Sequence, residues 1–247
     1  LMWRSFTHWV GGMGVLVFIM VFLPLGGGQN MHIMRAESPG PEVSKLVPKV
    51  KQTAFILYSI YLAMTVILFI ALLIVKMDVF EAINTAFSTA GTGGFSIRDD
   101  SCASLSPVQQ WLIIIFMFLF GVNFNTYYLL LRKKIKDAFN AEVRVYTTFV
   151  ILAISIISVN IYLQLSEFSN FGDAIRHAAF YVTALISTTG FATVDYNLWP
   201  TISHVVLMLA LFITIPALNS GTVGIMVPVG VVFTLVVARI MYKKGLI

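Results

Sequence analysis

The sequence Ser88-Thr89-Ala90-Gly91-Thr92-Gly93-Gly94-Phe95-Ser96 decides how the rest of the chain is interpreted. Its chemistry is repeated further along, in Ser187-Thr188-Thr189-Gly190-Phe191-Ala192-Thr193. When Gly94 is aligned with Gly190, further identities follow at the same offset: Thr92 with Thr188, Phe95 with Phe191, and Asp99 with Asp195. Self-similarity at one offset is the sign of an internal repeat, so we expect the chain to contain two related units.

Each glycine-containing stretch lies between a short apolar segment and a long apolar run. The short segments, residues 78–90 and 171–186, are too brief to cross ~30 Å of hydrocarbon. The runs that follow, residues 107–131 and the region from residue 200, are long enough. This order predicts a membrane span, a half-span, a polar loop that returns to the surface, and a second span.

The composition indicates an all-α polytopic membrane protein. Hydrophobic residues make up 58% of the chain, charged residues 11%, and the mean hydropathy is +0.89. Soluble domains average roughly 45–50% apolar and about 25% charged residues. Cys102 is the single cysteine, which excludes an intramolecular disulfide and any metal site built on several cysteines.

The predicted organisation follows from the apolar runs and the polar stretches between them. We expect a helix at 1–23, a polar loop at 24–52, a span–loop–span unit at 53–131 with its glycine loop at 91–96, a basic loop at 132–144, and a second unit at 145–247 with its glycine loop at 188–193 and a long interrupted last helix.

The distribution of basic residues predicts which ends face the cytoplasm. One side holds Arg35, Lys45, Lys49, Lys51, Arg132, Lys133, Lys134, Lys136, Arg144, Lys243 and Lys244. The positive-inside rule makes that side cytoplasmic, so both glycine loops face outward. The formal charge of +5 therefore reports orientation in the membrane. A nucleic-acid site is not expected, because no aromatic residue is interleaved with the basic block at 132–136.

Placed on the outer side, at the carbonyl ends of two half-spans that dip into the membrane, the glycine loops are typical of a cation-conducting pore. The carbonyl end of a helix carries roughly half a negative charge and favours a cation, and backbone carbonyls can replace the hydration shell of an ion. The predicted filter residues are Thr92, Gly93, Gly94, Phe95, Thr188, Thr189, Gly190 and Phe191. Asp99 and Asp195 are expected at the outer mouth, where they would raise the local cation concentration. The alternative is a pair of ordinary extracellular turns.

Several motifs resemble the TrkH/KtrB family of potassium transporters, in the superfamily that includes the plant HKT proteins. They are Trp3-Arg4-Ser5-Phe6-Thr7-His8-Trp9-Val10-Gly11-Gly12-Met13-Gly14, Arg35-Ala36-Glu37-Ser38-Pro39-Gly40-Pro41, Thr92-Gly93-Gly94-Phe95-Ser96, Gly121-Val122-Asn123-Phe124-Asn125, and Thr188-Thr189-Gly190-Phe191-Ala192-Thr193 with Trp199-Pro200. The resemblance implies potassium as the transported ion, bound by filter carbonyls alone. It also implies four span–loop–span units around one pore, and a cytosolic nucleotide-binding ring as regulatory partner.

On that family plan, residues 1–23 resemble the closing helix of a first unit, 53–131 the second unit, and 145 onward the third. The remaining pore loops lie outside this sequence, so we expect either a partial chain or a homodimer that completes the pore. The family has a flexible gating loop within the last helix of the third unit. Here that place holds Asn219, Ser220, Gly221 and Thr222, with Met226 where a lysine is expected, so a gate and a simple kink both remain open.

Two function classes therefore stand. The first is uptake of potassium or another monovalent cation across the cell membrane. The second is a non-conducting remnant or assembly subunit of such a transporter. Neither an enzyme nor a cofactor is expected, because His8, His32, His177 and His204 are scattered and no paired carboxylates lie within a span.

Overall fold

The structure is a computed structural model that describes residues 1–12, 50–165 and 170–217, the side chains of 50–53 and 211–217 excepted. The helices, in chain order, are α1 (Met2–Gly12), α4 (Val50–Ile74), α5 (Val79–Ala90), α6 (Pro107–Phe120), α7 (Phe124–Leu131), α8 (Ile135–Ala138), α9 (Ala141–Gln164), α10 (Phe171–Ile186), the 3-10 turn η2 (Tyr196–Leu198) and α11 (Thr201–Ala217). No strand occurs in these ranges, so the expected all-α fold class is confirmed.

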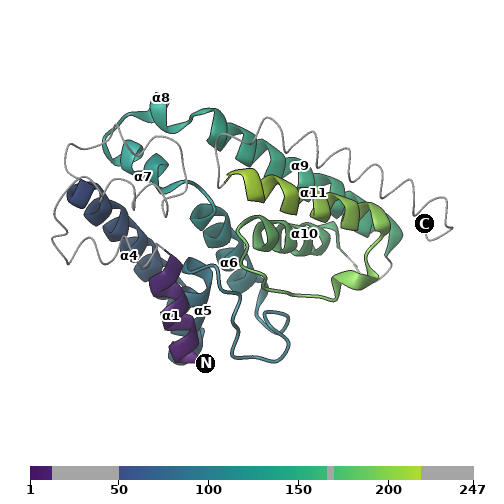
Figure 1. The fold of residues 1–247 in the computed structure, drawn as a ribbon. Coiled ribbons are helices and arrows are strands. Elements are labelled where there is room, and N and C mark those ends of the chain that lie inside the picture. Colours follow the sequence, from purple (N-terminus) through teal and green to yellow (C-terminus); the bar gives the residue numbers. More distant parts are fainter. Residues whose placement is uncertain (13–49, 166–169, 218–247) are drawn as a thin grey trace.

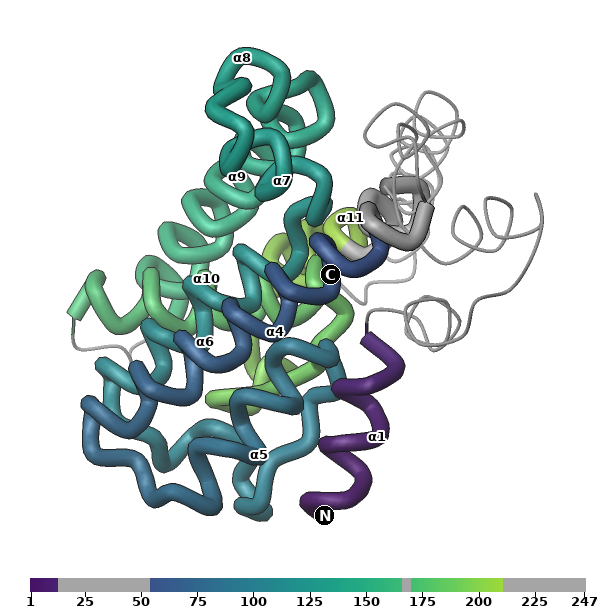
Figure 2. The backbone as a smooth tube through the Cα atoms, turned by 90° about the vertical axis from the view of Figure 1, so that its left-hand side faces the viewer, coloured from purple at the N-terminus to yellow at the C-terminus, as the bar shows by residue number. Residues whose placement is uncertain are grey.

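The described helices form two units of three helices each, in which a span-length helix is followed by a half-span and a further apolar helix. The first is α4–α5–α6 and the second is α9–α10–α11. Figure 1 shows the two units side by side, with α10 lying against α6, and α1 packs along α5 (Figure 2). The interface between α6 and α10 brings the two glycine loops to the same region of the molecule.

The lengths of the helices separate spans from half-spans. Ala54–Ile74 of α4 and all of α9 are long and apolar enough to cross a membrane. With a rise of 1.5 Å per residue, the 12 residues of α5 reach about 18 Å and the 16 residues of α10 about 24 Å. Both are shorter than the ~30 Å hydrocarbon core, and they coincide with the short segments expected at 78–90 and 171–186.

Local chemistry sets where α5 begins and ends. The Asp78 carboxylate accepts a hydrogen bond from the Phe80 N–H at 3.0 Å, and Glu81 lies in the first turn. Both carboxylates favour a helix N-terminus. The helix ends at Gly91, where the glycine loop begins.

The apolar run at 107–131 is not one continuous span, as the sequence had indicated. It divides into α6 and α7, which meet at 87°. Gly121 ends α6, and Asn123 starts α7 by accepting the Asn125 N–H at 3.0 Å. Tyr127 and Tyr146 donate to the carbonyls of Leu119 and Phe118, at 2.6 and 3.1 Å. The bond from Tyr146 supplies a donor to the Phe118 carbonyl at the break, and the Leu119 carbonyl also accepts the Val122 N–H at 3.1 Å.

An aromatic cluster holds α1 to the first unit. Trp9 is only 9% exposed and stacks on Tyr61 with 5.6 Å between ring centroids. Its indole N–H donates to Thr65 at 3.1 Å, and the Tyr61 hydroxyl donates to the Trp9 carbonyl at 2.9 Å. Trp3, by contrast, is 75% exposed. Trp9 is therefore a core residue that fixes α1 against α4 and α5.

Candidate functional site at the paired glycine loops

The two glycine loops share an alternating backbone. Thr92 and Gly94 have φ of 54° and 67°, and Thr188 and Gly190 have φ of 58° and 79°. Gly93 and Thr189, which lie between them, are not in the left-handed region. Left-handed conformations are costly for residues other than glycine. Backbone strain of this kind often lies at functional sites, and here it occurs at two equivalent threonines. Alternation of hand turns successive peptide groups the same way, and lets consecutive carbonyls face one side.

The amide hydrogens of both loops point back to the half-helices. Gly93 N–H donates to the Ser88 carbonyl at 2.7 Å, and Thr189 N–H, at the equivalent place, donates to the Ala184 carbonyl at 2.8 Å. Each loop is therefore anchored to the carbonyl end of its own half-helix.

The loop carbonyls, in contrast, accept no hydrogen bond from the described part of the chain. Among the described residues, none donates to the carbonyl oxygens of Thr92, Gly93, Gly94, Thr188, Thr189 or Gly190. Thr92, Gly93 and Gly94 are half-buried and Thr189 is buried, whereas Thr188 and Gly190 are exposed. These oxygens are therefore available to a bound cation.

The two loops touch each other at Gly94. A methyl group at that Cα would overlap the carbonyl oxygen of Thr189, and would lie 3.2 Å from the carbonyl carbon of Gly190. Gly94 is thus required twice, by its positive φ and by the approach of the neighbouring loop. No described atom lies within 4 Å of the equivalent methyl position at Gly190.

The residues around the loops differ between the repeats. The Ser88 hydroxyl accepts the Phe95 N–H at 2.5 Å, whereas Ala184 occupies the equivalent place in the second unit. Phe191 is 2% exposed and lies in the core cluster of the first unit. Phe95 is half-buried and lies under the Arg4 guanidinium, 3.9 Å from its ring centre. The two predicted filter phenylalanines therefore have different environments.

Helix α1 lies directly behind the first loop. A methyl group on Gly12 would lie 2.9 Å from the Gly91 Cα, and one on Gly93 would lie 2.9 Å from the His8 ring. Small residues permit such close helix contact. A hollow of about 450 Å³ remains beside this contact, and it is lined by Thr7, His8, Gly11, Gly12, Gly91 and Thr92. His8 makes an edge contact with the Phe95 ring at 5.3 Å.

The residues predicted at the outer mouth lie beyond the loops and are exposed. The Asp195 carboxylate accepts the backbone N–H and the side-chain amide of Asn197, at 3.0 and 2.8 Å, and so starts η2. Asp99 lies at the surface in the segment after the first loop. The candidate gate residues Asn219, Ser220, Gly221 and Thr222 lie outside the described residues.

Two polar contacts beside the loops were not foreseen from the sequence. His177 of α10 contacts the Thr193 hydroxyl at 2.9 Å, and Arg98 pairs with Glu81 of α5 at 2.5 Å. Each contact joins residues in different segments of the chain, and no local sequence motif predicts such a pairing. In the part of the chain that the structure describes, no group of three or more His, Cys, Asp or Glu residues could hold a metal ion.

Comparison with known proteins gives consistent matches. The family model described as "TrkH: Cation transport protein" matches residues 1–226. The Trk system potassium uptake protein TrkH of Escherichia coli (strain K12) is 32% identical over 217 residues, which cover 86% of this chain and 45% of that protein. TrkG of the same strain is 29% identical over 216 residues, covering 86% and 44%.

A solved structure agrees with the fold. The crystal structure of the potassium transporter TrkH from Vibrio parahaemolyticus matches with a TM-score of 0.68 and 25% identity, over 85% of this chain and 43% of that one. The chain thus spans less than half the length of the relatives that it matches.

Proposed function

The chain belongs to the TrkH family of cation transport proteins, and from that premise we propose that it carries potassium across the cell membrane through a pore lined by its two glycine loops. The observation that carries the proposal is the set of unpaired carbonyls at Thr92–Gly94 and Thr188–Gly190, on backbones of alternating hand. Proteins of this family that resemble the chain are named as potassium uptake proteins.

The loop carbonyls would act as the ion ligands. A potassium ion that leaves water must exchange its hydration shell for other oxygens, and rings of backbone carbonyls supply them. The half-helices α5 and α10 add their negative ends at the same place. Phe95 and Phe191 follow the carbonyl ligands and support the loops from behind. Potassium is the substrate, and the proposed transport uses no cofactor.

The proposed orientation puts the glycine loops outside and the basic loop at 132–144 in the cytoplasm. Arg132, Lys133, Lys134 and Lys136 support it, because basic residues are retained on the cytoplasmic side. In this orientation Asp99 and Asp195 face the external solution. Their negative charge would attract cations to the pore entrance.

The pore needs more carbonyls than this chain supplies. A cation must be surrounded, and loops with unsatisfied carbonyls cannot face lipid, where each such group costs several kcal/mol. We propose that further pore loops complete the ring, either from a second copy of the chain or from additional family units. A cytosolic nucleotide-binding ring is the proposed regulatory partner, and the lipid bilayer surrounds the assembly.

Reconstitution tests the proposal. The purified 247-residue chain is inserted into liposomes, and potassium uptake is followed together with the mass of cross-linked species. We expect uptake that increases with the dimer fraction, or with added chains that carry further family units. A folded, inserted chain that takes up no potassium under either condition would instead support the alternative, a non-conducting remnant or assembly subunit.

A further inference from the structure

The segment that follows the first glycine loop also holds the second one. We call this segment, residues 96–105, the strap. The Ala192 carbonyl accepts the Cys102 N–H at 2.9 Å, and the Ala192 N–H donates to the Ser101 hydroxyl at 3.1 Å. The strap therefore binds both backbone polar groups of Ala192, which lies two residues beyond Gly190.

The strap is shaped to present these two groups. Ser101 has a φ of 59°, which turns the backbone so that its hydroxyl and the next N–H face Ala192. The Ser96 hydroxyl donates to the Ser101 carbonyl at 2.7 Å and accepts the Arg98 N–H at 3.1 Å. The turn is therefore fixed at both ends, directly after Phe95 of the first loop.

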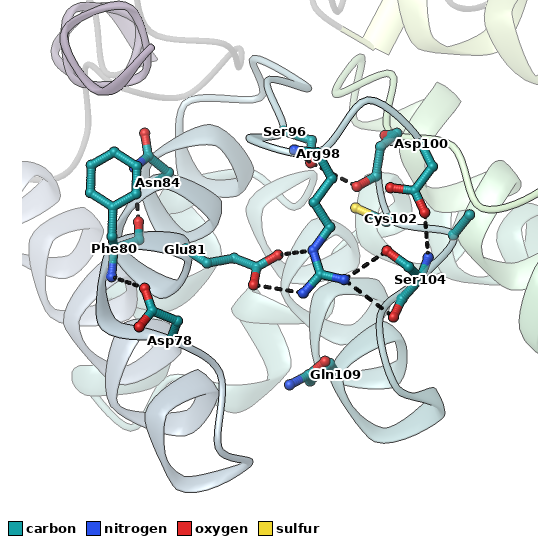
Figure 3. A network of polar contacts seen from close by, with 12 residues as sticks. Asp78, Phe80, Glu81, Asn84, Ser96, Arg98, Asp100, Cys102, Ser104 and Gln109 are labelled. Atoms are coloured by element: carbon teal, nitrogen blue, oxygen red, sulfur yellow. Dashed lines mark hydrogen bonds and ion pairs between the residues drawn. The ribbon is translucent and has the colours of Figure 1, made fainter.

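An ion pair fixes the strap to the first half-helix. Arg98 donates from Nε and Nη2 to the two oxygens of Glu81, at 2.5 and 2.8 Å, and from Nη1 to the Ser104 hydroxyl at 2.6 Å (Figure 3). Glu81 is only 7% exposed. A bidentate guanidinium–carboxylate pair combines charge with fixed geometry, so Arg98 joins the start of α5 to the far half of the strap.

Two further contacts complete the attachment. The Asp100 carboxylate accepts the Ser104 N–H at 2.9 Å, and Ser104 lowers the pKa of Asp100. Gln110 of α6 is 3% exposed and donates to the Cys102 carbonyl at 2.9 Å. Cys102, whose N–H bonds Ala192, is therefore itself held by α6 through its carbonyl.

We propose that Ser101 and the Glu81–Arg98 pair are positioning residues that hold the second glycine loop in register with the first, and thereby set the preference of the pore for potassium. The loops also meet at Gly94 and Thr189, so a shift of Ala192 would move the Thr189 carbonyl relative to those of the first loop. The proposal rests on the proposed function, because it assumes that these carbonyls bind the ion.

Cys102 offers a native reporter of the strap. It is the single cysteine of the chain and is 2% exposed. Burial raises the pKa of its thiol to about 12, so the reactive thiolate is scarce near neutral pH. A maleimide will modify Cys102 only when the strap separates from Ala192 and α6.

Ser101→Gly and Arg98→Lys test the two attachments. Glycine keeps the left-handed backbone but loses the hydroxyl that bonds Ala192. Lysine keeps the charge but cannot bond both oxygens of Glu81 and Ser104 together. Ser106→Ala is the matched control, because Ser106 caps α6 just after the strap and has no bond to Ala192.

Two measurements are made on the purified chain. The first is the rate of Cys102 labelling in potassium and in sodium, which we expect to be slower in potassium for the parent. Ser101→Gly and Arg98→Lys should remove this difference, and Ser106→Ala should keep it. The second is the ratio of potassium to sodium uptake in liposomes, which should fall by roughly tenfold in the two variants, since one lost hydrogen bond to a positioned group has about that effect.

The outcomes separate the two proposals. If both variants expose Cys102 but keep the parent ratio of potassium to sodium uptake, the strap does not set selectivity and the inference is wrong, while the pore assignment stands. If the parent takes up no potassium, either as the dimer or with added chains that carry further family units, the pore assignment fails. In that case potassium-dependent labelling that Ser101→Gly abolishes still supports the coupling of strap and loop, and labelling that is indifferent to potassium overturns it.

Discussion

Gly94 and Gly190 hold equivalent places in the repeat but have different surroundings. Both have positive φ, which glycine adopts without strain. Only Gly94 faces a neighbouring backbone, the carbonyl of Thr189, while no described atom lies near the corresponding side of Gly190. The first glycine is fixed by contact between the loops and the second by its own backbone alone.

Alanine at the two positions should therefore have unequal effects. Gly94→Ala should abolish potassium uptake, because the new methyl overlaps the Thr189 oxygen and the loops must separate. Gly190→Ala should reduce uptake by roughly tenfold, since a left-handed alanine costs about 1–2 kcal/mol without a clash. Initial uptake rates in liposomes, at equal inserted protein, measure the difference.

Gly172→Ala serves as the control, because Gly172 lies in the first turn of α10, has no positive φ, and has no neighbouring described atom within 4 Å of the position that a methyl group would take. Equal losses at Gly94 and Gly190 would show that the contact with Thr189 is unimportant.

At the level of residues, the sequence predicted which glycines line the pore, but not how their surroundings differ. The offset that pairs Gly94 with Gly190 is visible in the letters alone. The contact with Thr189 and the bonds to Ala192 depend on how α10 packs against α6, and the pairing of Arg98 with Glu81 depends on how the strap folds back onto α5. Such non-local contacts carry no periodicity or local motif that a single sequence could show.

The break between α6 and α7 is the clearest feature at the level of helices. A methyl on Gly121 would overlap the Tyr146 hydroxyl, which donates to the Phe118 carbonyl at 3.1 Å. Glycine is thus needed where α9 approaches the bend. Asn123 supplies the cap that starts α7 at its new direction.

Gly121→Ala should lower the thermal unfolding midpoint in detergent, because the methyl pushes Tyr146 away from Phe118. Adding Tyr146→Phe should recover part of the loss, because it removes the hydroxyl that the new methyl overlaps. The ring carbon that carried the hydroxyl would lie 3.3 Å from that methyl. Tyr146→Phe alone should cost about 1 kcal/mol through the lost hydrogen bond. A double variant as unstable as the sum of the single ones would rule out this contact as the reason for glycine.

The half-helices were predictable and the break was not, for physical reasons. Asp78 and Glu81 mark the start of α5, and the polar glycine loop marks its end. The run at 107–131 is strongly apolar on both sides of Asn123 and Asn125, so its average hydropathy still predicts one span. Gly121 can end a helix and Asn123 can start one. Whether the helix actually breaks there depends on Tyr127 and Tyr146, which donate to the carbonyls of Leu119 and Phe118 at the bend.

At the level of the whole molecule, the orientation in the membrane can be tested directly. In a Cys102→Ser background, a cysteine placed by Asp99→Cys should react with an impermeant thiol reagent added outside intact cells. One placed by Asp137→Cys, in the basic loop at 132–144, should react only after the membrane is opened. Both positions are exposed, so burial does not limit labelling. The reverse pattern would invert the proposed topology.

The two units of the chain share one core. Phe180 and Phe191 of the second unit are buried among Leu68, Ile113 and Met117 of the first. During synthesis the first unit is therefore inserted before the side chains that complete its interior have been translated.

A chain stopped after residue 165 should insert its helices yet be cut rapidly by protease in the membrane extract, while the 247-residue chain resists. The ribosome must add the second half-helix before the first unit acquires its final stability, so maturation of the two glycine loops is a single, late event.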